Sequence, residues 1–254
     1  MNTSILRRLA FTPLRSNLAV RHQNPMHHYH HRTLTTTSNT QEDPQQRDPV
    51  ITLLDHALTK VPTHGWTTHA LTAAATDLGY SPLSHTIATK GAPTLISHFL
   101  DRALDNTLIE VDDQLHELDT TNDRLRLICR TRLRQTMPLA ERWPEAVAIL
   151  ALPQNVPLAV KQLGRMSSEF WFAAGDQSKS IDWYARRSAL AAAYVAAELY
   201  MCEDRSPGYE ATFAFLDRRM RGIQSLENDC NKVLGFTTQF SRNFYNILSS
   251  RGLF

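Results

Sequence analysis

Signals that begin and end helices recur from residue 48 onward, and they constrain the fold of this chain more than any other feature. Cap residues followed by proline, as in Asp48-Pro49 and Ser206-Pro207, favour the first turn of a helix. Between these signals apolar residues follow helical spacing, whereas the alternation that marks strands is absent. The sequence therefore predicts an all-α helical bundle of about nine or ten helices.

The boundaries of these helices follow from glycine, proline and capping threonines. Prolines at 144, 153 and 157 are expected to divide the middle of the chain into short elements. The other predicted helices cover 49–61, 67–79, a short segment from 81, 93–118, 120–137, 180–203, 206–227 and 231–249.

The first 41 residues differ in charge from the rest of the chain. They contain no acidic residue and five arginines: Arg7, Arg8, Arg15, Arg21 and Arg32. Subtracting these from the 27 basic residues leaves 22 against 25 acidic residues, a mildly acidic remainder. With Ile5, Leu6 and Leu9 on one helical face, residues 1–34 resemble a mitochondrial transit peptide. A basic arm that binds another molecule is the alternative.

The composition of the remaining segments completes the predicted domain organisation. Residues 35–48 are polar and are expected to form a disordered linker. A single helical domain is expected over 49–229, followed by an amphipathic helix over 231–254.

Motifs that carry enzyme chemistry are missing from the sequence. There is no His-Glu-x-x-His or Glu-x-x-His pair, no Gly-x-Ser-x-Gly and no glycine-rich phosphate loop. The three cysteines, Cys129, Cys202 and Cys230, are far apart and suggest neither a disulfide framework nor a zinc site. We therefore expect a protein that is not an enzyme and has no metal or cofactor.

Residues 53–92 have the layout of a TetR-type DNA-binding head. A helix ends near Gly65-Trp66, a second runs to the turn Leu78–Ser81, and a recognition helix should follow. That third segment has Lys90 as its only full positive charge, although DNA binding needs cations against phosphates. The pattern predicts a TetR-like fold without nucleic acid, and a DNA-binding transcriptional regulator is kept as the alternative function.

Two internal segments allow both a structural and a functional interpretation. Arg126, Arg130 and Arg134 share one helix face, which is either solvated or contacts anionic lipid or an acidic partner. The run 188–202 is apolar except for Glu198 and is too short to span a bilayer. It is either a plain core helix or one wall of a lipid cavity.

The C-terminal segment is amphipathic, with cations and no acid after Asp229. Such a helix either packs on its own domain or lies in a membrane interface, where each large apolar side chain contributes about 2 kcal/mol. The residues expected to bind membrane are Lys232, Val233, Phe236, Phe240, Arg242, Phe244, Ile247 and Leu248.

Five blocks, in this order over residues 50–222, resemble the ninth coenzyme-Q biosynthesis protein family, whose members bind lipid in ubiquinone biosynthesis. The blocks are PTHGW (62–66), ERWPEAVAILALPQNVP (141–157), FWFAAGDQS (170–178), DWYARRSALAA (182–192) and AELYMCEDRSPGYEATFAFLDRRM (197–220). Residues 231–254 match the family by character rather than by residue.

The resemblance implies a TetR-like protein that binds ubiquinone precursors or other isoprenoid lipids as cargo. It implies a location at the matrix face of the mitochondrial inner membrane. The implied partners are inner-membrane lipids, the coenzyme-Q biosynthetic complex and the demethoxyubiquinone hydroxylase, to which the precursor is presented. A homo-oligomer is compatible with the sequence.

Two sets of residues are expected to form binding sites, one for a partner protein and one for lipid. The partner surface implied by the resemblance consists of Asp182, Trp183, Tyr184, Arg186 and Arg187. Trp, Tyr and Arg are typical of binding hot spots because they combine area with directed polar groups. As residues that line a lipid cavity we predict Phe170, Trp171, Leu190 and Tyr194.

Overall fold

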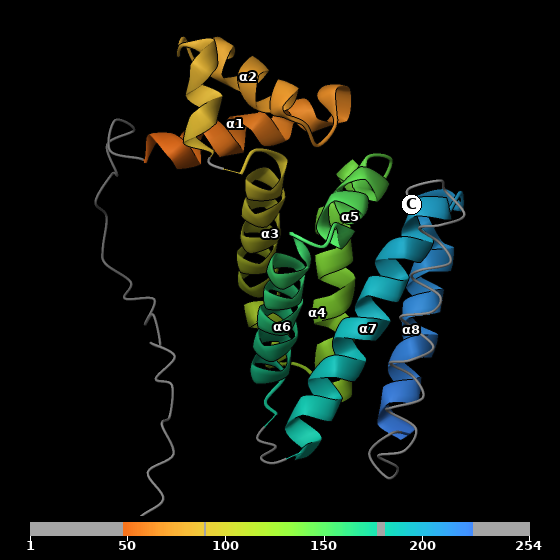
Figure 1. The fold of residues 1–254 in the computed structure, drawn as a ribbon. Coiled ribbons are helices and arrows are strands. Elements are labelled where there is room, and N and C mark those ends of the chain that lie inside the picture. The colour runs from red at the N-terminus through yellow and green to blue at the C-terminus, as the bar shows by residue number, and fades with distance from the viewer. Residues whose placement is uncertain (1–47, 89, 177–180, 226–254) are drawn as a thin grey trace, which may run out of the picture. The chain divides into compact units, whose positions relative to one another are not determined.

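The computed structural model describes residues 48–88, 90–176 and 181–225, and within these ranges the chain is helical with no strand (Figure 1). The all-α prediction is therefore confirmed. Eight α-helices and three short 3-10 helices, labelled η, are described. They are α1 (Pro49–His64), α2 (Thr68–Asp77), η2 (Pro82–Ile87), α3 (Ala92–Leu115), α4 (Thr121–Thr136), η3 (Met137–Leu139), α5 (Trp143–Ala151), α6 (Val156–Ala173), α7 (Ile181–Glu203), η4 (Pro207–Tyr209) and α8 (Glu210–Ser225).

Capping residues fix several of these boundaries as expected. The side chain of Asp48 accepts a hydrogen bond from the Val50 N–H at 2.9 Å, and Pro49 begins α1. At the start of α4, Thr120 Oγ1 accepts from the Asp123 N–H at 3.1 Å. These side chains satisfy backbone donors that would otherwise have no partner in the first turn.

Two elements differ from the expectation. The segment after Ser81 is a six-residue 3-10 helix, because a short stretch that ends in β-branched Thr86 and Ile87 gives an α-helix little support. The middle of the chain was predicted to consist of short elements, but α6 is 18 residues long. Pro157 lies in its first turn, where proline starts a helix instead of interrupting it.

An aromatic cluster joins the N-terminal head, formed by α1, α2 and η2, to the rest of the bundle. Trp66 packs edge-on against Phe99 of α3 and Trp143 of α5, with ring centroids 5.6 and 5.8 Å apart. The backbone N–H of Trp66 also donates to Glu145 Oε2 at 3.2 Å. Because Gly65 has a φ of 67° and a Cβ there would collide with the Glu145 carboxylate, glycine is required at this junction.

The face of α4 that carries Arg126, Arg130 and Arg134 packs against α8 and is only partly exposed to solvent. Arg126 Nε donates to Asp217 Oδ1 at 2.7 Å, and Arg130 Nη1 donates to Asp217 Oδ2 at 3.0 Å. The guanidinium groups of Arg130 and Arg134 also lie over the Phe213 ring, 4.7 and 5.9 Å from its centroid. These contacts hold α4 and α8 together.

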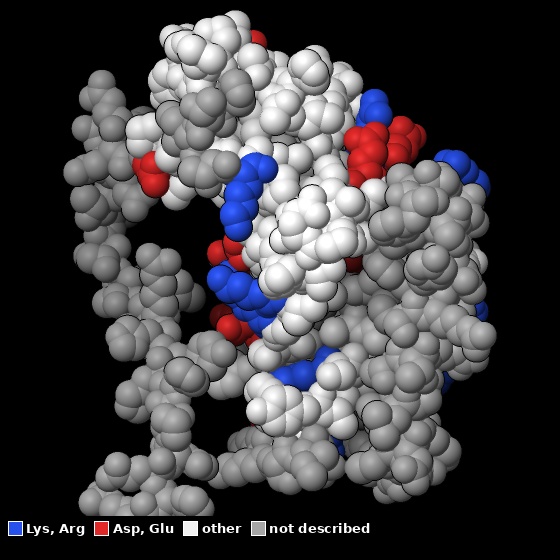
Figure 2. Space-filling view, viewed as in Figure 1, with Lys and Arg blue, Asp and Glu red and all other residues white. Residues whose placement is uncertain are grey.

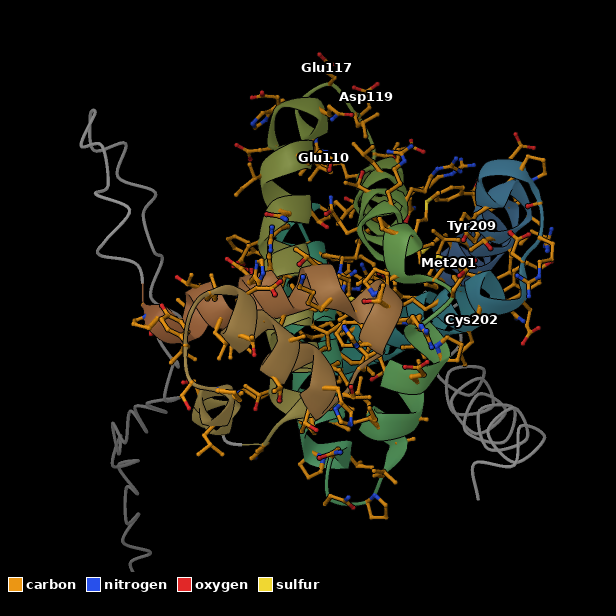
Figure 3. The ribbon with its side chains drawn as sticks, turned by 90° about the horizontal axis from the view of Figure 1, so that it is seen from above. Glu110, Glu117, Asp119, Met201, Cys202 and Tyr209 are labelled. Carbon is orange, nitrogen blue, oxygen red and sulfur yellow. The ribbon has the colours of Figure 1, made fainter. Side chains whose placement is uncertain are left out.

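The two ends of the antiparallel α6–α7 pair differ in their packing. At the end formed by the second half of α6 and the first half of α7, here called the filled end, Phe170, Trp171, Ala189, Leu190 and Ala193 belong to one continuous core. The opposite end, formed by the first half of α6 and the second half of α7, lies beside α5 (Figure 1). In Figure 3 the same bundle is viewed from above, with the head helices α1 and α2 in front.

Within the described ranges, no single helix combines the length and apolar character that crossing a bilayer requires. Only α5 and α6 together, bent by 116°, meet both conditions. The predicted transit peptide over 1–34, nearly all of the predicted linker and the predicted membrane helix over 231–254 lie outside the described residues.

Candidate functional site

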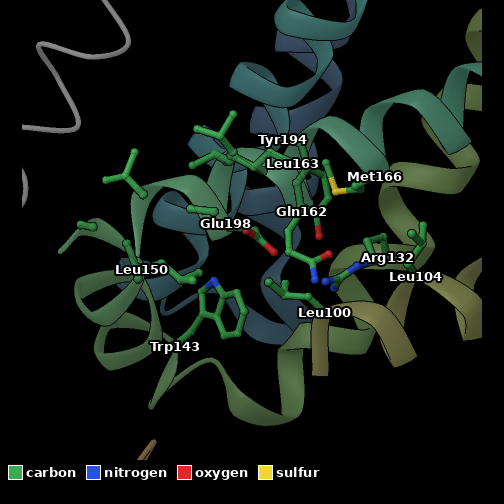
Figure 4. A pocket seen from close by; sticks show the side chains of 16 residues that line it. Leu100, Leu104, Arg132, Trp143, Leu150, Gln162, Leu163, Met166, Tyr194 and Glu198 are labelled. Atoms are coloured by element: carbon green, nitrogen blue, oxygen red, sulfur yellow. The ribbon is translucent and has the colours of Figure 1, made fainter. Parts of the chain in front are cut away.

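A cavity of about 250 Å³ lies at the second end of the α6–α7 pair, here called the hollow end (Figure 4). Five helices, α3 to α7, contribute to its wall, which is predominantly apolar. The lining residues are Leu100, Leu104, Arg132, Trp143, Val147, Leu150, Ala151, Val156, Ala159, Val160, Gln162, Leu163, Met166, Tyr194, Val195 and Glu198. An apolar hollow between helices of a bundle is a common form of small-molecule site.

The sharp turn between α5 and α6 opens this end of the bundle. Asn155 Nδ2 donates to the Ile149 carbonyl at 2.8 Å and fixes the turn, after which α6 leaves at 116° to α5. Leu152, Val156 and Val160 are exposed around the turn, Val160 by 63%. In the view of Figure 2, uncharged side chains occupy the centre of the described surface. The mouth of the cavity therefore has an apolar rim.

Five buried polar side chains interrupt the apolar wall. One of them, Gln162, donates to Ser97 and Asp101 of α3, and the other four are Arg132, Trp143, Tyr194 and Glu198. Arg132 is only 1% exposed. Its Nη1 donates to Thr136 Oγ1 at 2.8 Å, and its guanidinium lies 5.6 Å from the Phe99 ring centroid and 5.9 Å from that of Tyr194. We call these four residues the polar wall. It concentrates hydrogen-bonding groups in an otherwise apolar space.

Burial controls the ionisation of two groups in the polar wall. Loss of hydration raises the pKa of Glu198, while the nearby Arg132 guanidinium and polar neighbours act in the opposite direction. Loss of hydration also raises the pKa of the Tyr194 hydroxyl well above 10, so this group is neutral at ordinary pH. The polar wall thus contains one fixed cation, contributed by Arg132.

The four residues predicted to bind lipid divide between the two ends of the α6–α7 pair. Tyr194 lines the cavity. Phe170, Trp171 and Leu190 are buried at the filled end and do not line it. The Phe170 ring packs edge-on against the Tyr194 ring, with centroids 6.3 Å apart. Phe170 therefore supports a residue of the cavity wall without facing the cavity itself.

The residues predicted to bind a partner lie at the start of α7. Tyr184 is 70% exposed and its ring lies 4.7 Å from that of Trp183, centroid to centroid. Arg187 is buried, with its guanidinium 3.9 Å from the Trp183 ring centroid and its Nη1 3.3 Å from Asp176 Oδ2. Arg186 lies 3.5 Å from Asp176 Oδ1. The backbone of Asp182 is helical, and its side chain lies outside the described part.

Most of the cavity was missed by sequence reasoning, although two signals pointed to its polar wall. Glu198 is the only charged residue in the run 188–202, and a lone acid in an apolar helix needs a reason to be buried. Arg132 falls off the face shared by Arg126, Arg130 and Arg134. Both residues point inward, and both reach the same cavity.

Within the described ranges, no three His, Cys, Asp or Glu side chains gather closely enough to hold a metal ion. Cys129 is buried in the core, where loss of hydration raises the pKa of its thiol. That thiol is therefore poorly suited to act as a nucleophile.

Sequence comparison identifies a family. The COQ9 family model matches residues 156–227. Proteins named "Ubiquinone biosynthesis protein COQ9, mitochondrial" from Rattus norvegicus and Homo sapiens are each 37% identical to this chain, over 188 and 190 residues. Each alignment covers 71% of this chain, which spans 60% of the rat protein and 59% of the human one.

The fold has a counterpart among bacterial regulators. A TetR transcriptional regulator from Nitrosomonas europaea superimposes with a TM-score of 0.56 at 17% identity, covering 70% of this chain and all of the regulator. This likeness confirms the TetR-like fold and carries no functional information at that identity.

A fungal relative decides the family assignment. The mitochondrial coq9 protein of Schizosaccharomyces pombe is 31% identical over 201 residues, which cover 79% of this chain and 80% of the relative. The resemblance predicted from the five sequence blocks is thereby confirmed, and the chain belongs to the COQ9 family.

Proposed function

We propose that this protein is a non-catalytic accessory factor of ubiquinone biosynthesis that binds an isoprenoid lipid in the cavity at the hollow end. The observation that carries the proposal is the apolar cavity of about 250 Å³ between α3 and α7. Family membership supports the pathway, since the relatives are named ubiquinone biosynthesis proteins. The cavity is slightly smaller than the common range of about 300–1,000 Å³ for ligand pockets, so it accommodates one end of the lipid.

The physical role of such a cavity is to lower the cost of moving a lipid out of the bilayer. Exposing apolar surface to water costs roughly 25 cal/mol per Å², which makes a prenylated ring nearly inaccessible to a soluble active site. The exposed apolar rim at Leu152, Val156 and Val160 offers a path on which part of the tail stays shielded.

Quinone extraction from liposomes tests this proposal. The full chain is mixed with liposomes that contain decylubiquinone, the liposomes are sedimented, and quinone in the supernatant is quantified. Ala159→Phe places a large side chain in the cavity wall and should reduce extraction about tenfold. Phe172→Ser removes an exposed apolar side chain that does not line the cavity and should extract as the wild type does. Absence of extraction by the wild type, or equal extraction by Ala159→Phe, would contradict the proposal.

The surface around Tyr184 is proposed to bind the demethoxyubiquinone hydroxylase, and the coenzyme-Q biosynthetic complex is proposed as a further partner. Trp183 and Tyr184 present adjoining aromatic rings at the start of α7, held by Arg187. An exposed tyrosine ring supported by a half-buried tryptophan provides contact area with little loss of side-chain entropy.

A substitution at Tyr184 separates this contact from folding. Because Tyr184 is mostly exposed, Tyr184→Lys should leave the unfolding free energy within about 0.5 kcal/mol of the wild type. Co-purification with the hydroxylase should fall at least about tenfold, since hot-spot residues contribute about 2 kcal/mol or more. Tyr200→Lys is a control on the same helix, because Tyr200 is partly exposed and stacks on Phe215 of α8. Unchanged co-purification of Tyr184→Lys would remove this surface from the proposal.

The location is proposed to be the matrix face of the mitochondrial inner membrane. The relatives are named mitochondrial, and the basic, acid-free segment 1–34 has the character of a transit peptide. Docking on the membrane is assigned to the amphipathic stripe within 231–254, whose cations suit anionic lipids.

The charge of the head opposes a DNA-binding role despite the TetR-like fold. Residues 48–92 contain two lysines against three aspartates, and Lys60 is ion-paired with Asp77. A six-residue 3-10 helix occupies the place of the recognition helix. Neutralising phosphates needs several cations on one face, so we propose that the head does not bind an operator.

A further inference from the structure

Exposed apolar side chains gather at residues 152–160, where α5 turns into α6, and we call this segment the corner. Val156 and Val160 are one helical turn apart on α6, and Leu152 precedes Val156 by the same spacing. All three side chains are exposed. In Figure 3 the α5–α6 turn, in green, lies at the lower edge of the described bundle. The apolar groups of the corner are therefore accessible to a broad surface.

The two helices that meet at the corner have the apolar character of a membrane segment. Taken together, α5 and α6 are long and apolar enough to cross a bilayer, but they are bent by 116°. A buried core helix has the same composition, yet at the corner the apolar side chains face outward. An apolar segment that turns back with its apolar groups outside is suited to lying in the boundary between head groups and acyl chains.

The backbone of the corner offers few polar groups that need water. The Leu152 carbonyl accepts from the N–H groups of Asn155 and Val156 at 2.8 and 3.1 Å. Pro153 and Pro157 have no N–H. Because a backbone group without a partner is costly in apolar surroundings, a turn bonded in this way can enter the edge of a bilayer at little cost.

The charge around the corner suits an anionic surface. Residues 146–168 contain no Asp or Glu, whereas Lys161 and Arg165 are present. Arg165 is ion-paired with Asp101 and Asp105 of α3. Lys161 is exposed and forms no ion pair within the described residues. A cation beside an apolar insertion strengthens binding to anionic lipids.

Exposure of one apolar side chain would not by itself indicate a membrane contact, as Ile109 of α3 shows. Ile109 is 69% exposed, close to the 63% of Val160. However, Asp105 and Asp113 lie four residues before and after Ile109, and both are exposed on the same helix face. An anionic bilayer repels such a face, so the combination of apolar exposure and missing acids distinguishes the corner.

We propose that the corner inserts into the surface of an anionic bilayer, as a contact separate from the segment 231–254. Leu152, Val156 and Val160 enter the boundary below the head groups, and Lys161 stays at the level of the phosphates. The inference rests on the proposed function in one respect, because Val156 and Val160 also line the cavity. Insertion places the mouth of the cavity against the membrane, so that a lipid enters without crossing water.

Hydrogen exchange of the full chain tests whether the corner itself contacts the bilayer. The chain is transferred to deuterated buffer with and without vesicles made of equal parts of phosphatidylcholine and phosphatidylglycerol, and exchange is followed by mass spectrometry. The amides of residues 154–158 should exchange at least about tenfold more slowly on the vesicles. Unchanged exchange at these amides in vesicle-bound protein would overturn the inference, since another occupant would then have to cover the corner.

Aspartate substitutions test the apolar side chains of the corner. Leu152→Asp and Val160→Asp should each weaken vesicle binding about tenfold and abolish the slow exchange at 154–158 in the fraction that stays bound. Leu152 does not line the cavity, so its effect is separate from ligand binding. Ile109→Asp is the control of matched exposure and should behave as the wild type does. Equal vesicle binding by all three variants and the wild type would overturn the inference.

A lysine substitution tests the charge. Lys161→Gln should weaken binding to the anionic vesicles about fivefold and leave binding to phosphatidylcholine vesicles unchanged. Lys90→Gln removes another exposed lysine, which lies beside the head, and should bind both kinds of vesicle as the wild type does. An equal effect of the two substitutions would contradict the placement of Lys161 at the membrane.

Quinone extraction by the wild type separates failure of this inference from failure of the proposed function. If the wild type extracts decylubiquinone but Leu152→Asp binds vesicles unchanged, the corner contact is overturned and lipid binding stands. If the corner is protected on vesicles but no quinone is extracted, lipid binding is overturned and the membrane contact stands. A wild type that neither binds vesicles nor extracts quinone would overturn both.

Discussion

The filled end and the hollow end of the α6–α7 pair use similar residue types and produce different interiors. At the filled end, alanines of α7 face large side chains of α6, so Phe170 and Trp171 close the space against Ala189 and Ala193. At the hollow end, α5 turns away at 116° and the side chains of α6 and α7 meet a void. The two ends show that burial alone does not tell whether a side chain contacts another side chain or faces a cavity. The position of the neighbouring helix decides this.

The largest expected difference between the two ends is the cost of truncating a side chain. Phe170→Ala removes a fully buried ring and should lower the unfolding free energy by about 3–5 kcal/mol. Leu163→Ala, beside the existing cavity and only partly buried, should cost about 1 kcal/mol. Chemical denaturation of both variants measures the difference, and equal losses would mean that the hollow end is packed as tightly as the filled end.

Enlarging a side chain should also destabilise the filled end more than the hollow end, with a difference of intermediate size. Ala193→Phe inserts a ring into a position with no exposed surface and should destabilise the fold by about 1–3 kcal/mol or more. Ala159→Phe extends into the cavity or over its rim and should change stability by less than about 0.5 kcal/mol. Thermal unfolding of the two variants decides this, and a large loss for Ala159→Phe would show that the cavity has no spare room.

The smallest expected effect on stability concerns the charges on α4. Arg130 bonds to the Asp217 carboxylate of α8, whereas Arg132, beside the cavity, has no hydrogen bond to a carboxylate. Burial would raise the pKa of Asp217, but Arg126 and Arg130 hold it below its ordinary value of 3.8. The folded state therefore gains stability above about pH 5 that is lost as the pH falls through this lowered pKa. Asp217→Asn should cost about 1–2 kcal/mol at pH 7, since Arg126 is partly solvent-screened.

Denaturation at two pH values checks that sign. The difference in unfolding free energy between the wild type and Asp217→Asn should shrink between pH 7 and pH 3, because the unfolded wild type takes up a proton at Asp217 at a higher pH than the folded protein does. A difference that stays constant over this range would show that Asp217 contributes by packing rather than by charge.

Local signals account for the part of the fold that the sequence predicted. Asp48 and Thr120 act within one turn of their own helix, so capping could be recognised without tertiary information. The segment at 82–87 and the length of α6 were predicted less well, because proline can either start or end a helix and its neighbours decide which.

The cavity could be predicted only in part, because it depends on an angle between helices. The four residues predicted to line a lipid cavity, Phe170, Trp171, Leu190 and Tyr194, are all buried, but only Tyr194 faces the void beside the bend between α5 and α6. Glu198 was noticed only as an interruption of an apolar run. It lines the cavity together with Arg132 of α4 and Trp143 of α5, which are distant in sequence.

The central claim is that the hollow end holds a lipid, and the lipid that co-purifies with the full chain tests it most directly. Lipids are extracted from equal amounts of the wild type and Ala159→Phe and quantified by mass spectrometry. The account predicts an isoprenoid quinone or its precursor bound to the wild type and at least about tenfold less on the variant. Equal lipid content in the two proteins, or a wild type that carries no isoprenoid lipid, would contradict it.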